Sequence, residues 1–244
     1  MANYQTAQTI GTQTSAAIDE GLRAHMTKIY GTMSVGMLVT GGVAWAVGTS
    51  PLLALFRDPI TLQPNILGWI IMFAPLLFVF GFAGMINRMS AATAQTMFYV
   101  FSAIMGLSIA WIFAAFTGVS IAQTFLATSI AFASLSLWGY TTKKDISGWG
   151  SFLMMGVIGL IVVSIVNLFV GSPAIAWAIS VIGILIFAGL TAYDTQRLKV
   201  EYIQHAQMAD EEWLGKSAIM GALSLYINFI NMFMFLLQFL GSRE

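Results

Sequence analysis

Long apolar runs recur along the chain, separated by short polar or charged segments. Seven of them are long enough to cross a hydrocarbon core of about 30 Å, since an α-helix rises about 1.5 Å per residue. They cover residues 29–47, 66–86, 97–116, 121–138, 152–170, 174–193 and 219–240. In lipid, every backbone polar group must find its hydrogen-bond partner within the protein, which a helix achieves by itself. The pattern predicts an all-α membrane protein, a bundle of seven transmembrane helices.

The segments between the runs predict how neighbouring helices connect. Residues 117–120 and 171–173 are so short that the helices on either side of each must form antiparallel hairpins, and Pro173 falls in a first helical turn, where its missing N–H is harmless. The proline-rich residues 48–65 predict a loop without regular structure. Residues 200–216 predict a long connection, which could contain a short interfacial helix or a docking surface. The polar residues 1–22 predict a flexible tail before a transmembrane domain of residues 23–244.

Composition narrows the class of protein. Of 244 residues, 58% are hydrophobic and 8% are charged, against about 25% charged in an ordinary soluble domain. Ten basic and ten acidic residues give a net charge of +0, so there is no general basic surface for nucleic acid. Without cysteine there is no thiolate chemistry, and the two histidines, His25 and His205, lie outside the apolar runs. We therefore expect neither an enzyme nor a cofactor.

The basic residues predict the orientation of the bundle in the membrane. With the N-terminus in the cytoplasm, eight of the ten fall on the cytoplasmic side and two outside, as the positive-inside rule favours. The eight are Arg23, Lys28, Arg88, Lys143, Lys144, Arg197, Lys199 and Lys216, and the two are Arg57 and Arg243. We expect a multi-pass protein of a bacterial inner membrane with its C-terminus outside.

The last two runs each carry a polar or small face at helical spacing. In the seventh run it consists of Ser217, Gly221, Ser224, Asn228, Asn231 and Gln238, and in the sixth of Ser180, Gly183, Phe187, Thr191 and Asp194. These two faces are predicted to meet. Small and amide side chains usually serve as packing seams between membrane helices, but Asn228 lies so deep that its amide needs a partner. Gly36, Gly106, Gly156 and Gly159 are predicted close-approach positions.

Asp194 ends a stretch of 20 residues, 174–193, that contains no charge. An ionisable group at the edge of a span costs a few kcal/mol and is a functional candidate by default. The structural alternative is an interfacial ion pair with Arg197, three residues further on, or with Lys199. Such a pair contributes about 0.2 to 0.5 kcal/mol and needs no function.

Three motifs carry a resemblance to a known family. They are GYTTKKDIS at residues 139–147, FAGLTAYDTQRLK at 187–199 and ALSLYINFINMFMFLLQFLG at 222–241. With them the chain resembles the bacterial branch of the Bax inhibitor (transmembrane Bax-inhibitor-motif) family over nearly all residues after Gly21. The resemblance implies a seven-helix bundle with the last helix at its centre. It also implies a pH-sensitive leak of calcium, or an exchange of calcium for protons, through a pore closed on the cytoplasmic side.

The resemblance also implies which residues close that pore. In such proteins two aspartates of the last two helices share a proton and are held by an arginine of the second helix. Here these positions fall on Asp194, Asn228 and Arg88, so the second acid is replaced by an amide. Asp145 matches an acid after the fourth helix, and Asn231 and Arg197 are accessory candidates.

The amide at Asn228 changes how the residues that close the pore can respond to pH. Two carboxylates in contact titrate as a coupled pair, whereas an amide does not titrate, so a less steep pH response is expected. Calcium takes six to eight oxygen ligands, so Asp194 predicts at most a weak transit site for that ion. The other function left open is a non-conducting regulator that binds another membrane protein, such as a quality-control protease.

Overall fold

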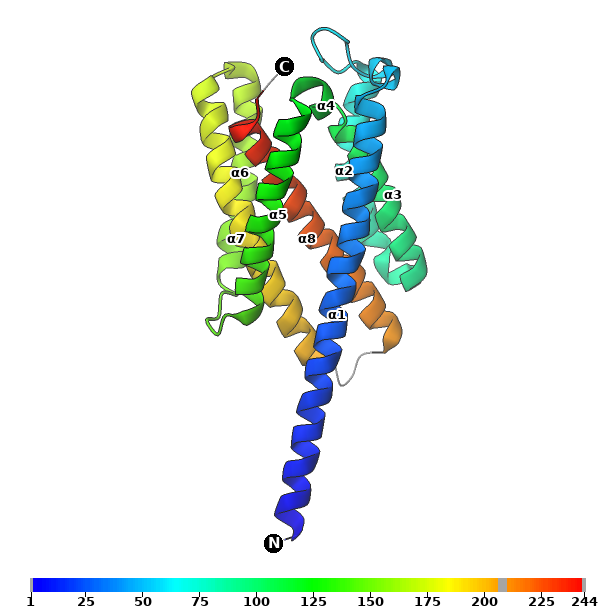
Figure 1. Ribbon diagram of the computed structural model, residues 1–244, viewed down its shortest axis with the longest axis vertical. Coiled ribbons are helices and arrows are strands. Elements are labelled where there is room, and N and C mark those ends of the chain that lie inside the picture. The colour runs from blue at the N-terminus through cyan, green and yellow to red at the C-terminus, as the bar shows by residue number, and fades with distance from the viewer. Residues whose placement is uncertain (1, 206–209, 243–244) are drawn as a thin grey trace.

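The computed structural model describes residues 2–205 and 210–242, with side chains from residue 18 onward. Among these residues seven helices are long and apolar enough to span a membrane, as Figure 1 shows. Their bounds are α1 Ala2–Gly48, α2 Ile66–Met85, α3 Ala91–Ile109, α5 Gly118–Thr141, α6 Trp149–Val170, α7 Pro173–His205 and α8 Glu211–Leu240. The predicted all-α bundle of seven spans is confirmed, and α7 begins at Pro173 as expected.

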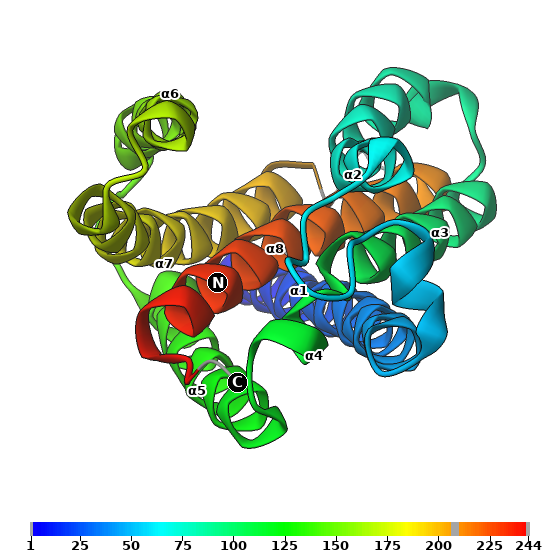
Figure 2. The ribbon, with the colours of Figure 1, turned by 90° about the horizontal axis from the view of Figure 1, so that it is seen from above.

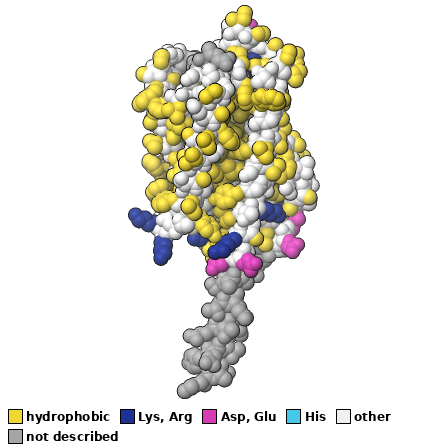
Figure 3. Space-filling view, in the orientation of Figure 1, with side chains coloured by type: hydrophobic (Ala, Val, Ile, Leu, Met, Phe, Trp, Pro, Cys, Tyr) yellow, Lys and Arg dark blue, Asp and Glu magenta, His cyan; other side chains and the backbone are white. Residues whose placement is uncertain are grey.

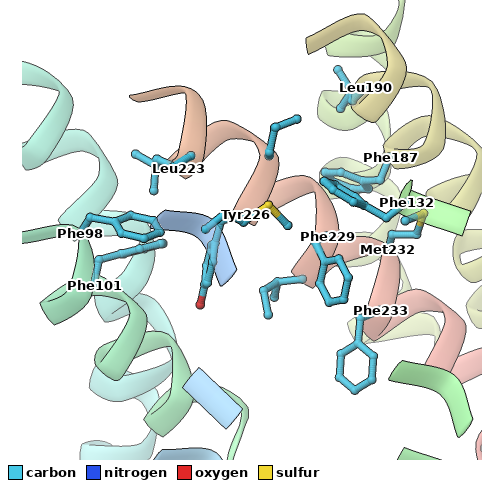
Figure 4. Packing of buried hydrophobic residues seen from close by; sticks show 14 of the residues in the cluster. Phe98, Phe101, Phe132, Phe187, Leu190, Leu223, Tyr226, Phe229, Met232 and Phe233 are labelled. Atoms are coloured by element: carbon cyan, nitrogen blue, oxygen red, sulfur yellow. The ribbon is translucent and has the colours of Figure 1, made fainter. Parts of the chain in front are cut away.

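Helix α8 is the centre of the bundle, and it runs between the other helices when seen from above (Figure 2). Of its most apolar stretch, 61% is buried, against 11% for α6 at the periphery. Tyr226 of α8 is fully buried and packs against Phe98 and Phe101 of α3 at ring-centroid distances of 5.6 and 5.5 Å (Figure 4). Its hydroxyl is hydrogen-bonded to Thr40 of α1. Aromatic packing and one buried hydrogen bond therefore join three helices at the core.

Among the described residues, three short helices interrupt the predicted pattern. The third apolar run is not one straight helix: α3 ends at Ile109, and a turn leads into the short helix α4, Ile112–Ala115. The loop predicted to lack regular structure contains a 3-10 helix, η1 Pro51–Leu55, which Ser50 caps at its start. A second 3-10 helix, η2 Ile86–Arg88, follows α2. Hydrophobicity predicts that a segment spans but not where its backbone turns.

The long connection predicted at residues 200–216 is wrong, because α7 continues to His205 and α8 begins at Glu211. The Asp210 carboxylate accepts a hydrogen bond from the Trp213 amide at 2.7 Å, which caps α8. Acidic side chains in the first turn, Glu211 and Glu212, favour a helix start there. The predicted tail, residues 1–22, lies largely outside the described side chains and stays a prediction.

Lysine and arginine side chains gather at one end of the molecule, while apolar side chains cover its flank (Figure 3). We call this the basic end. It carries the connection between α5 and α6, with Lys143 and Lys144, and the last turns of α7, with Arg197 and Lys199. The opposite end carries η1 and the turn between α6 and α7.

Three of the four predicted close-approach glycines are confirmed. A side-chain carbon added at Gly36 would lie 2.7 Å from Phe98, at Gly106 2.7 Å from the Thr40 carbonyl oxygen, and at Gly156 2.8 Å from Ile186. At Gly159 it would meet nothing within 4 Å, so that expectation is wrong. Gly159 faces open space because α6 is peripheral.

Gly139 of α5 gives a stability prediction. A methyl group there would overlap the carbonyl oxygen of Ala192 in α7, a backbone atom that cannot move alone. Gly139→Ala is therefore expected to push α5 and α7 apart and to cost about 1 to 3 kcal/mol, measured as a lower thermal midpoint of the purified protein. Gly159→Ala is the matched control, and alanine's better helix propensity should leave its midpoint unchanged or raised. Equal midpoints for the two variants would contradict the contact.

Candidate functional site

Asp194 is a buried carboxylate on α7, with 5% of the residue exposed. Its Oδ1 lies 2.9 Å from Nη2 of Arg197, one turn further along the same helix. The Arg197 side chain is 47% exposed, so the pair has one buried and one accessible partner. Water screens such a pair, so its Coulomb energy alone contributes little to the stability of the closed arrangement of side chains.

The second carboxylate oxygen of Asp194 accepts hydrogen bonds from side chains of α8. Its Oδ2 accepts a hydrogen bond from Ser224 Oγ at 2.7 Å and another from Asn228 Nδ2 at 2.7 Å. Arg197 also donates to Ser224 Oγ at 3.4 Å. We call these four residues, Asp194, Arg197, Ser224 and Asn228, the Asp194 cluster. Hydrogen bonds to a charged acceptor are the stronger kind, so the cluster ties α7 to α8 at the basic end of the bundle.

The predicted meeting of the two polar faces is confirmed along the length of both helices. Towards the opposite end, Ser180 of α7 donates to Gln238 of α8 at 3.4 Å, and a side-chain carbon at Gly183 would lie 2.6 Å from Phe235. Asn228, whose depth called for a partner, finds it in Asp194. Ser224, interpreted from the sequence as a packing residue, donates a hydrogen bond to the Asp194 carboxylate. The signal for it was its position one turn before Asn228.

The ion pair predicted between Arg88 and Asp194 is wrong. Arg88 is exposed in η2, and within the described part of the chain the ion pairs join Asp194 to Arg197 and Glu212 to Lys216. Arg197 reaches the carboxylate from one turn away on the same helix. The structural alternative, an ion pair at that spacing, and the predicted contact with Asn228 therefore occur together.

A large cavity of about 1700 Å³ extends from the opposite end of the bundle to the Asp194 cluster. Residues of α2 and α6 line its sides, and residues of α7 and α8 form its floor; Figure 2 shows the arrangement of these four helices. The lining at the opposite end includes Arg57 and Trp69, and the polar side chains of α8 follow one another along the floor. They are Ser224, Asn228, Asn231 and Gln238. The polar face of α8 predicted from the sequence therefore lines a cavity in addition to packing against α7.

A smaller pocket of about 430 Å³ lies at the basic end, bounded by α2, η2, α7 and α8. It shares Arg197, Ser224 and Ile227 with the large cavity. Two of these three residues belong to the Asp194 cluster. Arg197 and Ser224 of the cluster, together with Ile227, therefore form the partition between the two spaces, with Asp194 and Asn228 on the side of the large cavity.

The accessory candidates lie in different places. Asn231 lines the large cavity and donates to the Ile227 carbonyl at 2.9 Å. Asp145 lies outside the cluster, exposed between α5 and α6. Its carboxylate accepts a hydrogen bond from the Ser147 amide at 2.9 Å, which holds the pKa of Asp145 below its usual value.

The chemistry of the cluster limits what it can hold. Among the described residues that line the large cavity, Asp194 is the one acid, and its two oxygens are already hydrogen-bonded. No group of three metal-ligating side chains occurs in the described part of the chain. A calcium ion prefers six to eight oxygen ligands, so this arrangement does not provide a tight calcium site by itself.

The fold and the site define a class: a polytopic membrane protein in which a hydrogen-bonded ion pair, with one buried and one accessible partner, lies where two cavities meet. The family model described as "Inhibitor of apoptosis-promoting Bax1" matches residues 22–244, and the chain belongs to this Bax inhibitor family. It is 44% identical over 234 residues to an uncharacterized protein of Caulobacter vibrioides, covering 93% of this chain and 92% of that one. It is 42% identical over 224 residues to the inner membrane protein YbhL of Escherichia coli K12, covering 92% and 94%.

Proposed function

We propose that this protein is a pH-sensitive conduit for calcium, a leak channel or a calcium/proton exchanger, gated at the Asp194 cluster. We further propose that it resides in the inner membrane with the basic end in the cytoplasm. The E. coli relative is named an inner membrane protein, and eight of the ten basic residues fall on the side assigned to the cytoplasm. The large cavity then opens towards the outside.

The observation that carries the proposal is the partition between the two spaces. Arg197, Ser224 and Ile227 line both the large cavity and the smaller pocket, so a modest separation of α7 and α8 would join them. Asp194 makes three contacts at this partition: an ion pair with Arg197 of its own helix, and two hydrogen bonds from α8 that join the two helices. Protonation of Asp194 removes the charge that attracts Arg197. The closed arrangement is then weakened in acid, which gives the gate its pH sensitivity.

The direct test is calcium flux into liposomes that contain only the purified protein, measured with a trapped calcium-sensitive dye. We expect a slow leak at neutral pH that increases on mild acidification. Empty liposomes prepared identically set the background. Flux equal to that background at both pH values would contradict conduction.

Arg197→Gln gives a sharper form of this test. The variant removes the accessible partner of the ion pair, worth about 1 kcal/mol for a partly exposed pair, so the leak at neutral pH should rise roughly fivefold. Arg88→Gln removes the same charge at an exposed site that makes no ion pair in the described part of the chain, and its leak should match wild type. The reverse pattern would restore Arg88 as the gating arginine.

A second candidate is a non-conducting regulator that binds another membrane protein, such as a quality-control protease. Asn228 favours it, because a cluster with one titrating acid is also well suited to a purely structural tie between α7 and α8. Purified protein that is folded but passes no calcium would support this candidate. Co-purification of a membrane protein with wild type, tested against Gly159→Ala as a neutral variant, would then identify the partner.

A further inference from the structure

A separate basic pocket of about 710 Å³ lies at the basic end, between the α5–α6 connection and α7. Four cations and two acids line it. The cations are Lys143, Lys144, Arg197 and Lys199, and the acids are Asp145 and Glu201. The pocket therefore has a net positive charge of about +2 before any ligand binds, if each group carries its usual charge.

The walls of this pocket are fixed by hydrogen bonds. Gln196 of α7 accepts from the Ile146 amide at 3.0 Å and donates to the Lys144 carbonyl at 2.8 Å, which pins the connection to the helix. Lys199 Nζ donates to the Tyr140 carbonyl at 2.8 Å. The shape of the site thus does not depend on a ligand, and a preformed site avoids the entropic cost of ordering a loop on binding.

Two of the four cations are not neutralised by an ion pair in the described part of the chain. Lys143 and Lys144 are exposed, and in the described part of the chain their ammonium groups take part in neither of the two ion pairs. Asp145, the nearest acid in sequence, is turned to the Ser147 amide. Two lysines held together on a fixed connection are a ready counterpart for an anion with several oxygens.

The position of the pocket relates it to the membrane surface. Trp138, near the end of α5, and Trp149, at the start of α6, lie with ring centroids 6.2 Å apart and are each partly exposed. Tryptophans concentrate at the level of lipid headgroups. The basic pocket follows directly after Trp138 in the chain and lies at that level.

We propose that this pocket binds a phosphate group, carried by the headgroup of an anionic phospholipid or by a soluble phosphate compound. Lys143 and Lys144 supply the first attraction, and Arg197 offers a planar guanidinium that pairs well with phosphate oxygens. The bound phosphate bridges the α5–α6 connection and α7.

One consequence rests on the proposed function. Arg197 belongs to both the basic pocket and the Asp194 cluster. A phosphate in the pocket competes with Asp194 for the same guanidinium, and by linkage anything that weakens the ion pair favours phosphate binding. Phosphate binding would then favour the open gate.

The binding test compares wild type with Lys143→Gln/Lys144→Gln, both full-length. The lipid arm measures the thermal midpoint in nanodiscs of phosphatidylcholine with and without phosphatidylglycerol, and the soluble arm measures binding of inorganic pyrophosphate by titration calorimetry. We expect wild type to respond in at least one arm, and the double variant to bind that ligand about tenfold more weakly or worse. A response in the lipid arm alone assigns the site to a phospholipid, and in the soluble arm alone to a free phosphate compound.

The matched control is Arg23→Gln/Lys28→Gln, which removes two exposed charges of the same end that do not line the pocket. It should respond like wild type. An equal loss in both double variants would reveal only general attraction to anions, and an unchanged double lysine variant or no response of wild type in either arm would equally overturn the site. None of these measurements uses calcium flux, so failure of the proposed conduit leaves the binding result intact.

Discussion

Replacing Asp194 with asparagine is expected to raise the calcium leak at neutral pH about tenfold and to remove most of its dependence on pH. The variant cannot form the ion pair with Arg197, and its contacts with Ser224 and Asn228 become neutral hydrogen bonds. Charge-assisted bonds contribute more than neutral ones, and a loss of about 1.4 kcal/mol from the closed state is a tenfold change in population. Flux into liposomes across a series of pH values measures both effects.

Asp145→Asn is the control for this variant. It makes the same change in a carboxylate that is exposed and does not touch the cluster, so its leak and pH profile should match wild type. An unchanged profile in Asp194→Asn would refute the gate. A leak abolished at every pH would mean that the carboxylate is needed as a transit ligand for the ion rather than as a closing contact.

The spans could be predicted from the sequence because one force decides them. A run of apolar residues long enough to cross lipid has few other stable arrangements, and all seven runs are helical spans or parts of one. The turn between α3 and α4 was not visible, since residues on both sides of it are equally apolar. The start of α8 was missed because local capping by Asp210 sets it, not hydrophobicity, and α7 continues beyond its apolar run to His205.

The candidate site was half predicted. Helical periodicity placed Asp194 and Asn228 on facing stripes, and the structure brings them to 2.7 Å. The arginine was assigned to Arg88 through the family resemblance, while the contact formed is the local one to Arg197. Which of several cations reaches an acid depends on helix rotation and side-chain reach, and these follow from packing. The two spaces beside the cluster are likewise lined by residues of several helices. Their presence depends on how α2 and α6 pack against the core, and this packing cannot be predicted from any single stretch of sequence.

Replacing Asn228 with aspartate is expected to lower the calcium leak at neutral pH and to make its rise on acidification steeper. The Asn228 amide lies 2.7 Å from Asp194 Oδ2, so the new carboxylate would contact Asp194 and add a second negative charge near Arg197. Two acids in contact titrate as a coupled pair with two separate steps. Opening then requires loss of both charges instead of one, and the slope of log flux against pH should increase from about one proton towards two.

Asn231→Asp separates this effect from a general gain of negative charge in the cavity. Asn231 lines the same cavity one turn further along α8, but it donates to the Ile227 carbonyl and not to Asp194. Its variant should keep the wild-type slope, although cations gathered by the added charge could raise the flux at every pH. Equal slopes in Asn228→Asp and wild type would show that the proton on Asp194 does not control opening. A steeper slope in both variants would mean that any acid in the cavity suffices, and the specific contact between α7 and α8 would lose its role.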